Sequence, residues 1–208
     1  AVLYCLIDGF CRVCVHILNA SFEEKVVILE ALLSSIRDFY ADERDRKIIE
    51  IGINERSMVA QIFCRLRVRL RELLPGFDVD YEYNRHLRGA KMLRILLKNN
   101  HEKVSSVIPD LVIHQRDTDE HNAFVVEFKK VGVCSGVDNE KLKAFTGSGE
   151  NYQYDIGLRI ILVAECEQTT VDLWREGERM LRDVRIGDIA DDFGKLRKSS
   201  TFATALIG

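Results

Sequence analysis

The chain has 208 residues, of which 47% are hydrophobic and 30% are charged, and its formal net charge at pH 7 is −3. This composition is typical of a soluble globular protein, and no internal repeat or low-complexity tract is visible. The negative charge argues against a scaffold that coats nucleic acid by bulk electrostatics, although an enzyme needs only a local basic groove.

The six cysteines are irregularly spaced, and a chain of this length can fold without disulfides, so we expect a reducing compartment. Cys11 and Cys14 have CxxC spacing, but a zinc site would need a second pair and none follows, which favours core cysteines. The apolar residues 1–18 are interrupted by charges and are too short to span a bilayer comfortably. We therefore expect a cytoplasmic protein with no membrane association.

The first predicted helix covers residues 22–40, where apolar residues recur every three or four positions. The charged run 41–47 is interpreted as a loop or a helix end. Residues 1–50 are predicted to form a helical N-terminal extension packed on a main domain of residues 51–208.

A second predicted helix runs from Asn54, a good N-cap residue, to Leu74, and Pro75-Gly76 ends it. Arg65 and Arg69 share one face of this helix. With Arg85 they are weak candidates for contacts to a nucleic-acid backbone, because arginine matches phosphate oxygens. A solvated helix face is the competing interpretation.

Three strands are then predicted at 77–83, 107–116 and 123–130, followed by a helix at 138–146 and a strand at 157–165. Residues 169–184 are predicted to form an amphipathic helix. The order helix, three strands, helix, strand indicates an α/β fold with a mixed sheet flanked by helices.

The two strands around the turn 117–122 carry the informative residues. If the turn is centred between positions 118 and 119, facing residues have numbers summing to about 237, which places Asp110 opposite Glu127. Side chains alternate along a strand, so Lys129 points to the same side as Glu127, while Phe124, Val126 and Phe128 point to the other. Two acids and a lysine on one face could be a solvated ion-pair network. They also suit the binding of Mg²⁺ or Mn²⁺ and phosphodiester hydrolysis, because these ions prefer oxygen ligands.

The spacing Pro109-Asp110, sixteen residues, then Glu127-Phe128-Lys129 resembles the PD-(D/E)xK nuclease superfamily, whose fold is restriction-endonuclease-like with an αβββαβ core. Segments such as NERSMVAQIFCRLRVRL and PDLVIHQRDTDEHNAFVVEFKK look like uncharacterised bacterial members of that superfamily. The resemblance covers residues 54–166.

The resemblance implies that Asp110 and Glu127 bind the metal, that the backbone carbonyl of Phe128 is a further ligand, and that Lys129 is catalytic. It also implies a metal-binding glutamate on the preceding helix, a place that Glu55 fits, although an acid also suits a helix N-terminus electrostatically.

Several other residues are weaker candidates on the sequence alone. Some relatives carry a glutamine and a tyrosine after the lysine, and Gln153 and Tyr154 lie in a suitable region. Lys141 and Lys143 are interpreted as exposed helix lysines rather than phosphate contacts. His114 has the same strand parity as Asp110 but is not assigned a role.

The function expected from the sequence is metal-dependent hydrolysis of phosphodiester bonds, with DNA preferred to RNA as the partner and homodimer formation left open. The alternatives are a catalytically inactive nucleic-acid- or protein-binding module on the same fold, and a structural domain in which Asp110, Glu127 and Lys129 form ion pairs.

Overall fold

The computed structural model describes residues 20–51, 54–83, 85–86, 89–90, 92–96, 102–116, 121–132, 136–148 and 152–189; for 50, 85–86, 89–90, 92–96 and 102–106 it describes the backbone alone. In chain order the elements are α1 (Phe22–Ala41), α2 (Glu43–Glu50), α3 (Glu55–Leu73), β1 (Asp78–Tyr81), β2 (Arg85–His86), β3 (Gly89–Ala90), β4 (Met92–Leu96), β5 (Glu102–Ser106), β6 (Leu111–His114), β7 (Asn122–Lys130), α4 (Gly136–Thr146), β8 (Ile156–Leu162), the 3₁₀ turn η2 (Cys166–Gln168), β9 (Thr170–Arg175) and β10 (Glu178–Arg185).

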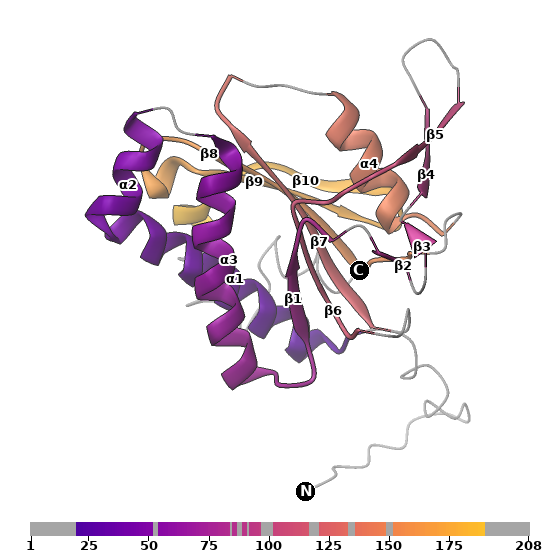
Figure 1. Ribbon diagram of the computed structural model, residues 1–208, viewed down its shortest axis with the longest axis horizontal. Coiled ribbons are helices and arrows are strands. Elements are labelled where there is room, and N and C mark those ends of the chain that lie inside the picture. The colour runs from indigo at the N-terminus through magenta and orange to yellow at the C-terminus, as the bar shows by residue number, and fades with distance from the viewer. Residues whose placement is uncertain are drawn as a thin grey trace, which may run out of the picture.

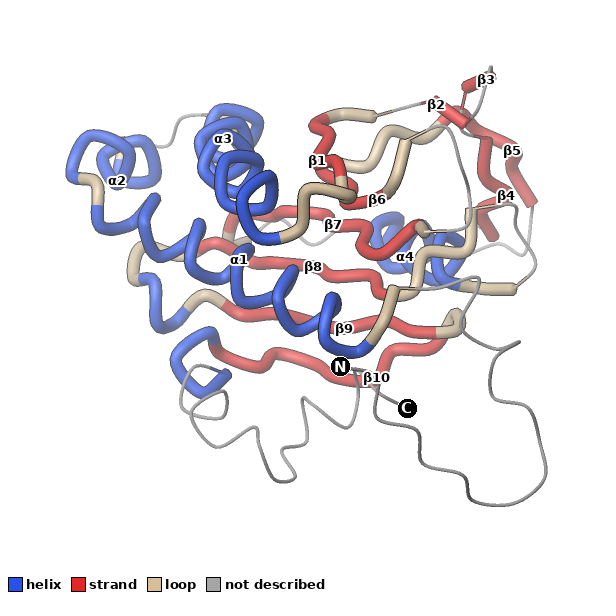
Figure 2. The backbone as a smooth tube through the Cα atoms, turned by 90° about the horizontal axis from the view of Figure 1, so that it is seen from below, coloured by secondary structure: helices blue, strands red, loops and turns tan. Residues whose placement is uncertain are grey.

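Six of these strands form one mixed sheet in the order β1-β6-β7-β8-β9-β10. The pair β7–β8 is parallel and is joined through α4, whereas the other neighbours in this sheet are antiparallel. Figure 1 shows α1, α2 and α3 on one side of the sheet and α4 on the other, and Figure 2 shows the strands side by side from β1 to β10. The predicted α/β class, with a mixed sheet flanked by helices, is confirmed.

Both faces of β7 are covered, because two hydrophobic clusters lie on opposite sides of the sheet. The larger cluster joins α1 and α3 to the side of β7 that carries Phe124, Val126 and Phe128. The smaller one lies under α4 and includes Val125, Leu142 and Phe145. The face of β7 beneath α4 therefore starts apolar at Val125 and continues into Glu127 and Lys129, because side chains alternate along a strand.

The predicted helix 22–40 is confirmed as α1. Ser21 and Glu24 form a capping box, in which each side chain accepts a hydrogen bond from the other residue's backbone N–H, at 3.2 and 2.7 Å. The buried face of α1 belongs to the same core as the sheet. Residues 1–19 lie outside the described part of the chain, so the predicted division into an N-terminal extension of residues 1–50 and a main domain of residues 51–208 stays a prediction.

The interpretation of residues 41–47 as a loop or a helix end holds for Ala41, where α1 ends, but is wrong from Glu43 onward, where a second helix, α2, starts. Its start is fixed by Asp42, whose side chain accepts hydrogen bonds from the backbone N–H groups of Arg44 and Asp45 at 2.9 and 3.4 Å. An aspartate N-cap satisfies donors that a helix otherwise leaves unpaired. The charged run is thus the first turn of a helix.

The predicted helix 54–74 is confirmed as α3, and the Asn54 side chain accepts a hydrogen bond from the backbone N–H of Arg56 at 3.0 Å. The predicted strands 77–83, 107–116 and 123–130 correspond to β1, β6 and β7, and the predicted helix 138–146 and strand 157–165 to α4 and β8. The sequence analysis did not predict the two small antiparallel pairs β2–β3 and β4–β5, which lie between β1 and β6 in the chain. In the described segments, no helix has the length and apolarity that crossing a membrane requires.

The predicted helix 169–184 is wrong, since these residues form the hairpin β9–β10. Its turn is Glu176-Gly177, and both residues have positive φ, at 51° and 77°. Arg175 pairs with Glu178 across the turn. Two consecutive residues with positive φ form a two-residue turn whose backbone twist matches the right-handed twist of the two strands that it joins. Glycine at the second of these positions favours this type of turn. A helix cannot continue through two such residues.

This turn predicts opposite effects for two neighbouring substitutions. Gly177→Ala should reduce the free energy of unfolding by about 1 kcal/mol, because a Cβ is strained at positive φ. That Cβ would also lie 3.4 Å from the Cα of Gly147. Glu176→Asn should leave stability unchanged or raise it slightly, because asparagine tolerates this conformation best after glycine. Urea unfolding measures both effects, and equal losses in the two variants would contradict the assigned turn.

Candidate functional site

The β6–β7 hairpin has the predicted register, which places Asp110 beside Glu127. Leu111 pairs with Val126 and Val112 with Val125, as the predicted sum of about 237 requires. Asp110 is the residue before β6, and its Oδ2 atom accepts a hydrogen bond from the backbone N–H of Phe128 at 2.7 Å. Asp110 therefore reaches β7 next to Glu127.

Glu127 and Lys129 lie on the same side of β7, under α4. Glu127 is only 1% exposed, which is unusual for an acid, because burying a carboxylate without a partner is costly. Lys129 is 14% exposed at its side chain, and its Nζ lies 3.0 Å from Oε1 of Glu55. A buried acid and a nearly buried lysine thus alternate with apolar residues along one strand.

Glu55 reaches these residues from the first turn of α3. Its Oε1 accepts a hydrogen bond from Lys129 Nζ, and its Oε2 accepts one from the backbone N–H of Lys130 at 3.2 Å. The acid predicted on this helix near the metal ligands is Glu55, and in the structure it contacts Lys129 and the Lys130 backbone and acts electrostatically on Asp110. Both of its carboxylate oxygens already have partners, so the predicted role of Glu55 as a metal ligand remains a prediction.

Two further residues come from α4, and the sequence analysis did not assign either of them to the site. Lys141, interpreted as an exposed helix lysine, is 19% exposed at its side chain, and its Nζ lies 3.4 Å from both carboxylate oxygens of Glu127. Asp138 is buried one turn earlier, with its oxygens 3.5 Å from Lys141 Nζ and 3.7 Å from Lys129 Nζ. The i,i+3 spacing of Asp138 and Lys141 on a helix that follows β7 directly is the sequence signal that could have identified them.

These side chains form one charged cluster, built from α3, the start of β6, β7 and α4. We call it the acid–lysine cluster; its members are Glu55, Asp110, Glu127, Lys129, Asp138 and Lys141. Four carboxylates and two ammonium groups give it a formal charge of −2 when all are ionised.

Burial and the neighbouring acids change the pKa values in this cluster. Burial, together with the charges of Asp110 and Asp138, raises the pKa of Glu127 to about 8, and the two lysines oppose this only in part. Burial also raises the pKa of Asp110, against the lowering effect of the Phe128 N–H and of Lys129. The pKa of Lys129 is raised even though burial lowers it, because the hydrogen bond to Glu55 and the charges of Asp138 and Asp110 favour the ammonium form.

With a pKa near 8, Glu127 largely holds its proton at neutral pH, because Lys141 and Lys129 offset only part of the effect of burial and of the neighbouring acids. Perturbed acids of this kind gather at functional sites, although structural ion-pair networks also produce them. An added positive charge would favour the ionised form of Glu127.

The donor atoms suit a hard cation, although they do not form a complete metal centre. Asp110 and Glu127 offer carboxylate oxygens, which Mg²⁺ and Mn²⁺ prefer. Across the described segments, no group of three or more His, Cys, Asp or Glu side chains is arranged to hold a metal ion. A cation here would have two carboxylates and the predicted Phe128 carbonyl, and would keep several waters. The Cys11–Cys14 pair lies outside the described residues.

The predicted arginine contacts are already engaged or not described. Arg65 Nη2 lies 2.5 Å from Asp45 Oδ2 and 3.5 Å from Asp42 Oδ2, and Arg69 forms an ion pair with Asp38. The side chain of Arg85 lies outside the described residues. A phosphate would have to displace the acids of α1 and α2 to bind Arg65 or Arg69.

His114 shares strand parity with Asp110 but lies away from the acid–lysine cluster. It is buried at the other end of β6, where its Nε2 lies 3.0 Å from Asp80 Oδ2 and its ring packs on Tyr83 at 4.8 Å between centroids. The hydrogen bonds to His114 and to Arg116 hold the pKa of Asp80 well below its usual range despite the opposing effect of burial. This group is a structural ion-pair network.

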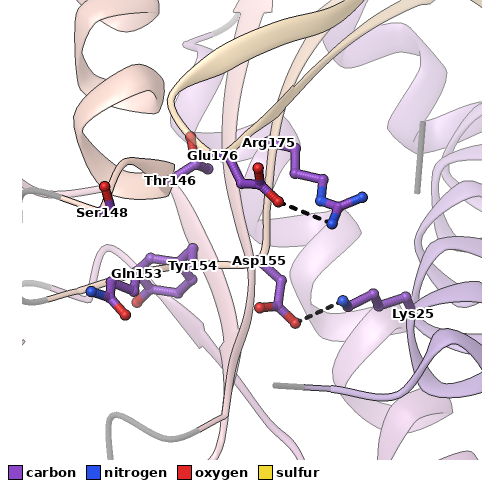
Figure 3. Close-up of a pocket in the computed structure, with 8 residues that line it drawn as sticks. All are labelled: Lys25, Thr146, Ser148, Gln153, Tyr154, Asp155, Arg175 and Glu176. Atoms are coloured by element: carbon purple, nitrogen blue, oxygen red, sulfur yellow. Dashed lines mark ion pairs between the residues drawn. The ribbon is translucent and has the colours of Figure 1, made fainter. Parts of the chain in front are cut away.

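Gln153 and Tyr154 lie at the other end of α4 from the cluster. Tyr154 is buried against Phe145, and both Gln153 and Tyr154 line a half-open hollow of about 410 Å³. Figure 3 shows its charged side chains in two ion pairs: Lys25 with Asp155 at 3.1 Å and Arg175 with Glu176 at 3.0 Å. The predicted glutamine and tyrosine are therefore not brought to Lys129.

No protein-family model matches the chain, and comparisons with curated proteins and with solved structures found no match.

Proposed function

We propose that this protein is a metal-dependent nuclease that hydrolyses DNA phosphodiester bonds. Asp110 and Glu127 would hold Mg²⁺ or Mn²⁺, with the backbone carbonyl of Phe128 as a third ligand. The observation that carries the proposal is the burial of Glu127, at 1% exposure, beside a second acid and within reach of two lysines.

The energetics of the cluster support this assignment over a purely structural one. A surface ion-pair network costs little to maintain and stabilises little. Here the carboxylate of Glu127 is buried next to Asp110, and removing a charge from water costs more than a single ion pair at 3.4 Å readily offsets. An apolar residue at this position of β7 would avoid that cost, because the preceding residue on the same face, Val125, is apolar and buried beneath α4.

The fold also supports the proposal. Apart from the two small pairs β2–β3 and β4–β5 between β1 and β6, the chain runs α3, β1, β6, β7, α4, β8, which has the predicted order of helix, three strands, helix and strand. In this order Asp110 precedes β6, and Glu127 and Lys129 lie on β7. We propose that this unit is a restriction-endonuclease-like core, and that β9 and β10 extend its sheet beyond β8.

Each side chain has a distinct role in the proposed reaction. A bound divalent cation would make a coordinated water more acidic and offset charge on the phosphate. Lys129 is held by Glu55 and Asp138 with its ammonium next to the acids, where it can orient the attacking water or contact the phosphate oxygens. Glu55 keeps Lys129 charged and in place.

Nuclease activity is tested by cleavage of supercoiled plasmid, single-stranded DNA and RNA in Mg²⁺, in Mn²⁺ and in EDTA. We expect cleavage of DNA that EDTA abolishes, and loss of that cleavage in Asp110→Ala, which removes a proposed ligand. Asp45→Ala, which removes an acid on α2 that pairs with Arg65, is the matched control and should retain activity.

The main alternative is a catalytically inactive nucleic-acid- or protein-binding module on the same fold. One observation favours it: the described residues contain no ready-made group of three metal-ligating side chains. Binding of DNA that EDTA does not affect, with no cleavage in either metal, would favour this module and contradict the nuclease.

A further inference from the structure

The ammonium of Lys141 lies beside the carboxylate of Glu127, where a cation bound to that carboxylate would lie. Its Nζ lies 3.4 Å from Oε1 and 3.4 Å from Oε2, so the ammonium is centred on the carboxylate. It also lies 3.5 Å from Oδ1 of Asp138, one turn earlier on α4. The ammonium is thus shared by two buried acids.

Among the described residues, no other cation lies within ion-pair distance of Glu127. Its neighbour across the sheet is Arg159, which pairs with it in the register of β7 and β8. Arg159 directs its guanidinium to Asp172, at 2.5 Å, and to Asn139, at 2.9 Å. Lys129 is similarly held by Glu55. Lys141 is therefore the cationic group that lies directly against Glu127.

We propose that Lys141 acts as an exchangeable cation: it occupies Glu127 in the metal-free protein and is released from Glu127 when a divalent cation binds there. This rests on the nuclease proposal, because it assumes that Glu127 is a metal ligand. The released ammonium remains next to the site and is free to contact a phosphate oxygen of the substrate.

The side chain and its helix suit this exchange. Lysine carries its charge on a flexible four-carbon stem with three rotatable donors, so its ammonium can move by a few ångströms while the helix stays fixed. Asp138, on the same helix, is a second partner for Lys141. It therefore lowers the free energy needed to move the Lys141 ammonium away from Glu127. A divalent cation and an ammonium cannot share one carboxylate without strong repulsion. Binding of a divalent cation to Glu127 must therefore oppose the contact between Lys141 and Glu127.

Titration of the full chain with Mn²⁺ alone, followed by electron paramagnetic resonance of the free ion, tests the exchange. Lys141→Gln removes the competing charge, so its affinity for Mn²⁺ should be about tenfold higher than that of the unsubstituted protein, given the strength of close charge–charge interactions. Lys141→Arg keeps the charge and should bind Mn²⁺ about as weakly as the unsubstituted protein. Lys143→Gln, on the same helix but exposed, is the matched control and should change nothing.

The outcomes separate this inference from the nuclease proposal. If Lys141 is only a structural ion-pair partner, Lys141→Gln will lower the melting temperature and leave Mn²⁺ affinity unchanged or weaker, which overturns the exchange alone. If neither the unsubstituted protein nor Lys141→Gln binds Mn²⁺, both the exchange and the metal-dependent nuclease are overturned.

Discussion

Lys129→Ala should reduce the rate of DNA cleavage by about 10²- to 10⁴-fold, the range usual for a positioned proton-transfer group or charge-stabilising donor. The loss is expected in the chemical step, because in the proposed reaction Lys129 acts on the water or the phosphate and does not hold the bulk of the substrate. Single-turnover cleavage with enzyme in excess measures it directly.

The effect of Lys129→Ala on folding should be small by comparison. Lys129 is 14% exposed at its side chain, and its loss leaves Glu55 and Asp138 with one partner fewer. We expect a cost of about 1–3 kcal/mol in unfolding free energy, so the variant should still fold. Lys143→Ala, which removes an exposed lysine from α4, should alter neither rate nor stability. An active Lys129→Ala variant would exclude Lys129 as the catalytic lysine.

Glu127 should make the metal-free protein less stable as pH rises. Its pKa is about 4.5 as a free side chain and about 8 in the folded chain, because burial and the nearby acids oppose ionisation. Below pH 4.5 both states hold the proton and Glu127 costs nothing. Between pH 4.5 and 8 the unfolded chain loses its proton first, so the folded state binds more protons and stability falls as pH increases. The full penalty, about 3–5 kcal/mol, is reached above pH 8.

Glu127→Gln should remove this dependence, since the amide does not ionise. Urea unfolding in EDTA at pH 6, 7, 8 and 9 should show the variant gaining stability relative to the unsubstituted protein as pH rises. Glu165→Gln, at an exposed position, should follow the unsubstituted protein throughout. A constant difference between Glu127→Gln and the unsubstituted protein over this range would contradict the raised pKa.

A cation that binds the ionised form of Glu127 should offset the penalty. Mg²⁺ should therefore raise the melting temperature more at pH 8 than at pH 6, and its binding should release a proton. In Glu127→Gln the stabilisation by Mg²⁺ should be much smaller at both values of pH.

The sequence predicts the fold best where local signals and tertiary packing agree. Helix α3 has an N-cap at Asn54, an apolar stripe and Pro75-Gly76 after its end, and its bounds follow within one residue. The failure at β9–β10 has a clear physical cause: Val171, Trp174 and Leu181 are three and seven residues apart, which fits a helix, while the decisive signal is the Glu176-Gly177 turn. The start of α2 depends on one side chain, Asp42, within a run of charges that is equally typical of a loop.

In the candidate site, too, the residues of one local element could be predicted together, whereas those brought in by tertiary packing could not. Asp110, Glu127 and Lys129 come from one hairpin, so strand alternation and a turn centre are sufficient to predict that they lie together. Asp138 and Lys141 come from α4, and their contribution depends on how the β7–α4–β8 crossover lays the helix over β7. The i,i+3 spacing of Asp138 and Lys141 places them on one face of α4, but it does not determine that this face lies over β7. The same reason explains why Arg65 and Arg69 could not be distinguished from free arginines, since their acidic partners are on other helices.

The binding of a divalent cation between Asp110 and Glu127 is tested most directly by a crystal structure of the protein soaked in Mn²⁺, with data collected to show the anomalous signal of manganese. We expect one strong anomalous peak within bonding distance of both carboxylates, with the Lys141 ammonium moved away from Glu127. Well-ordered Asp110 and Glu127 side chains with no peak between them, and Lys141 still centred on Glu127 at high Mn²⁺, would contradict the proposed metal site.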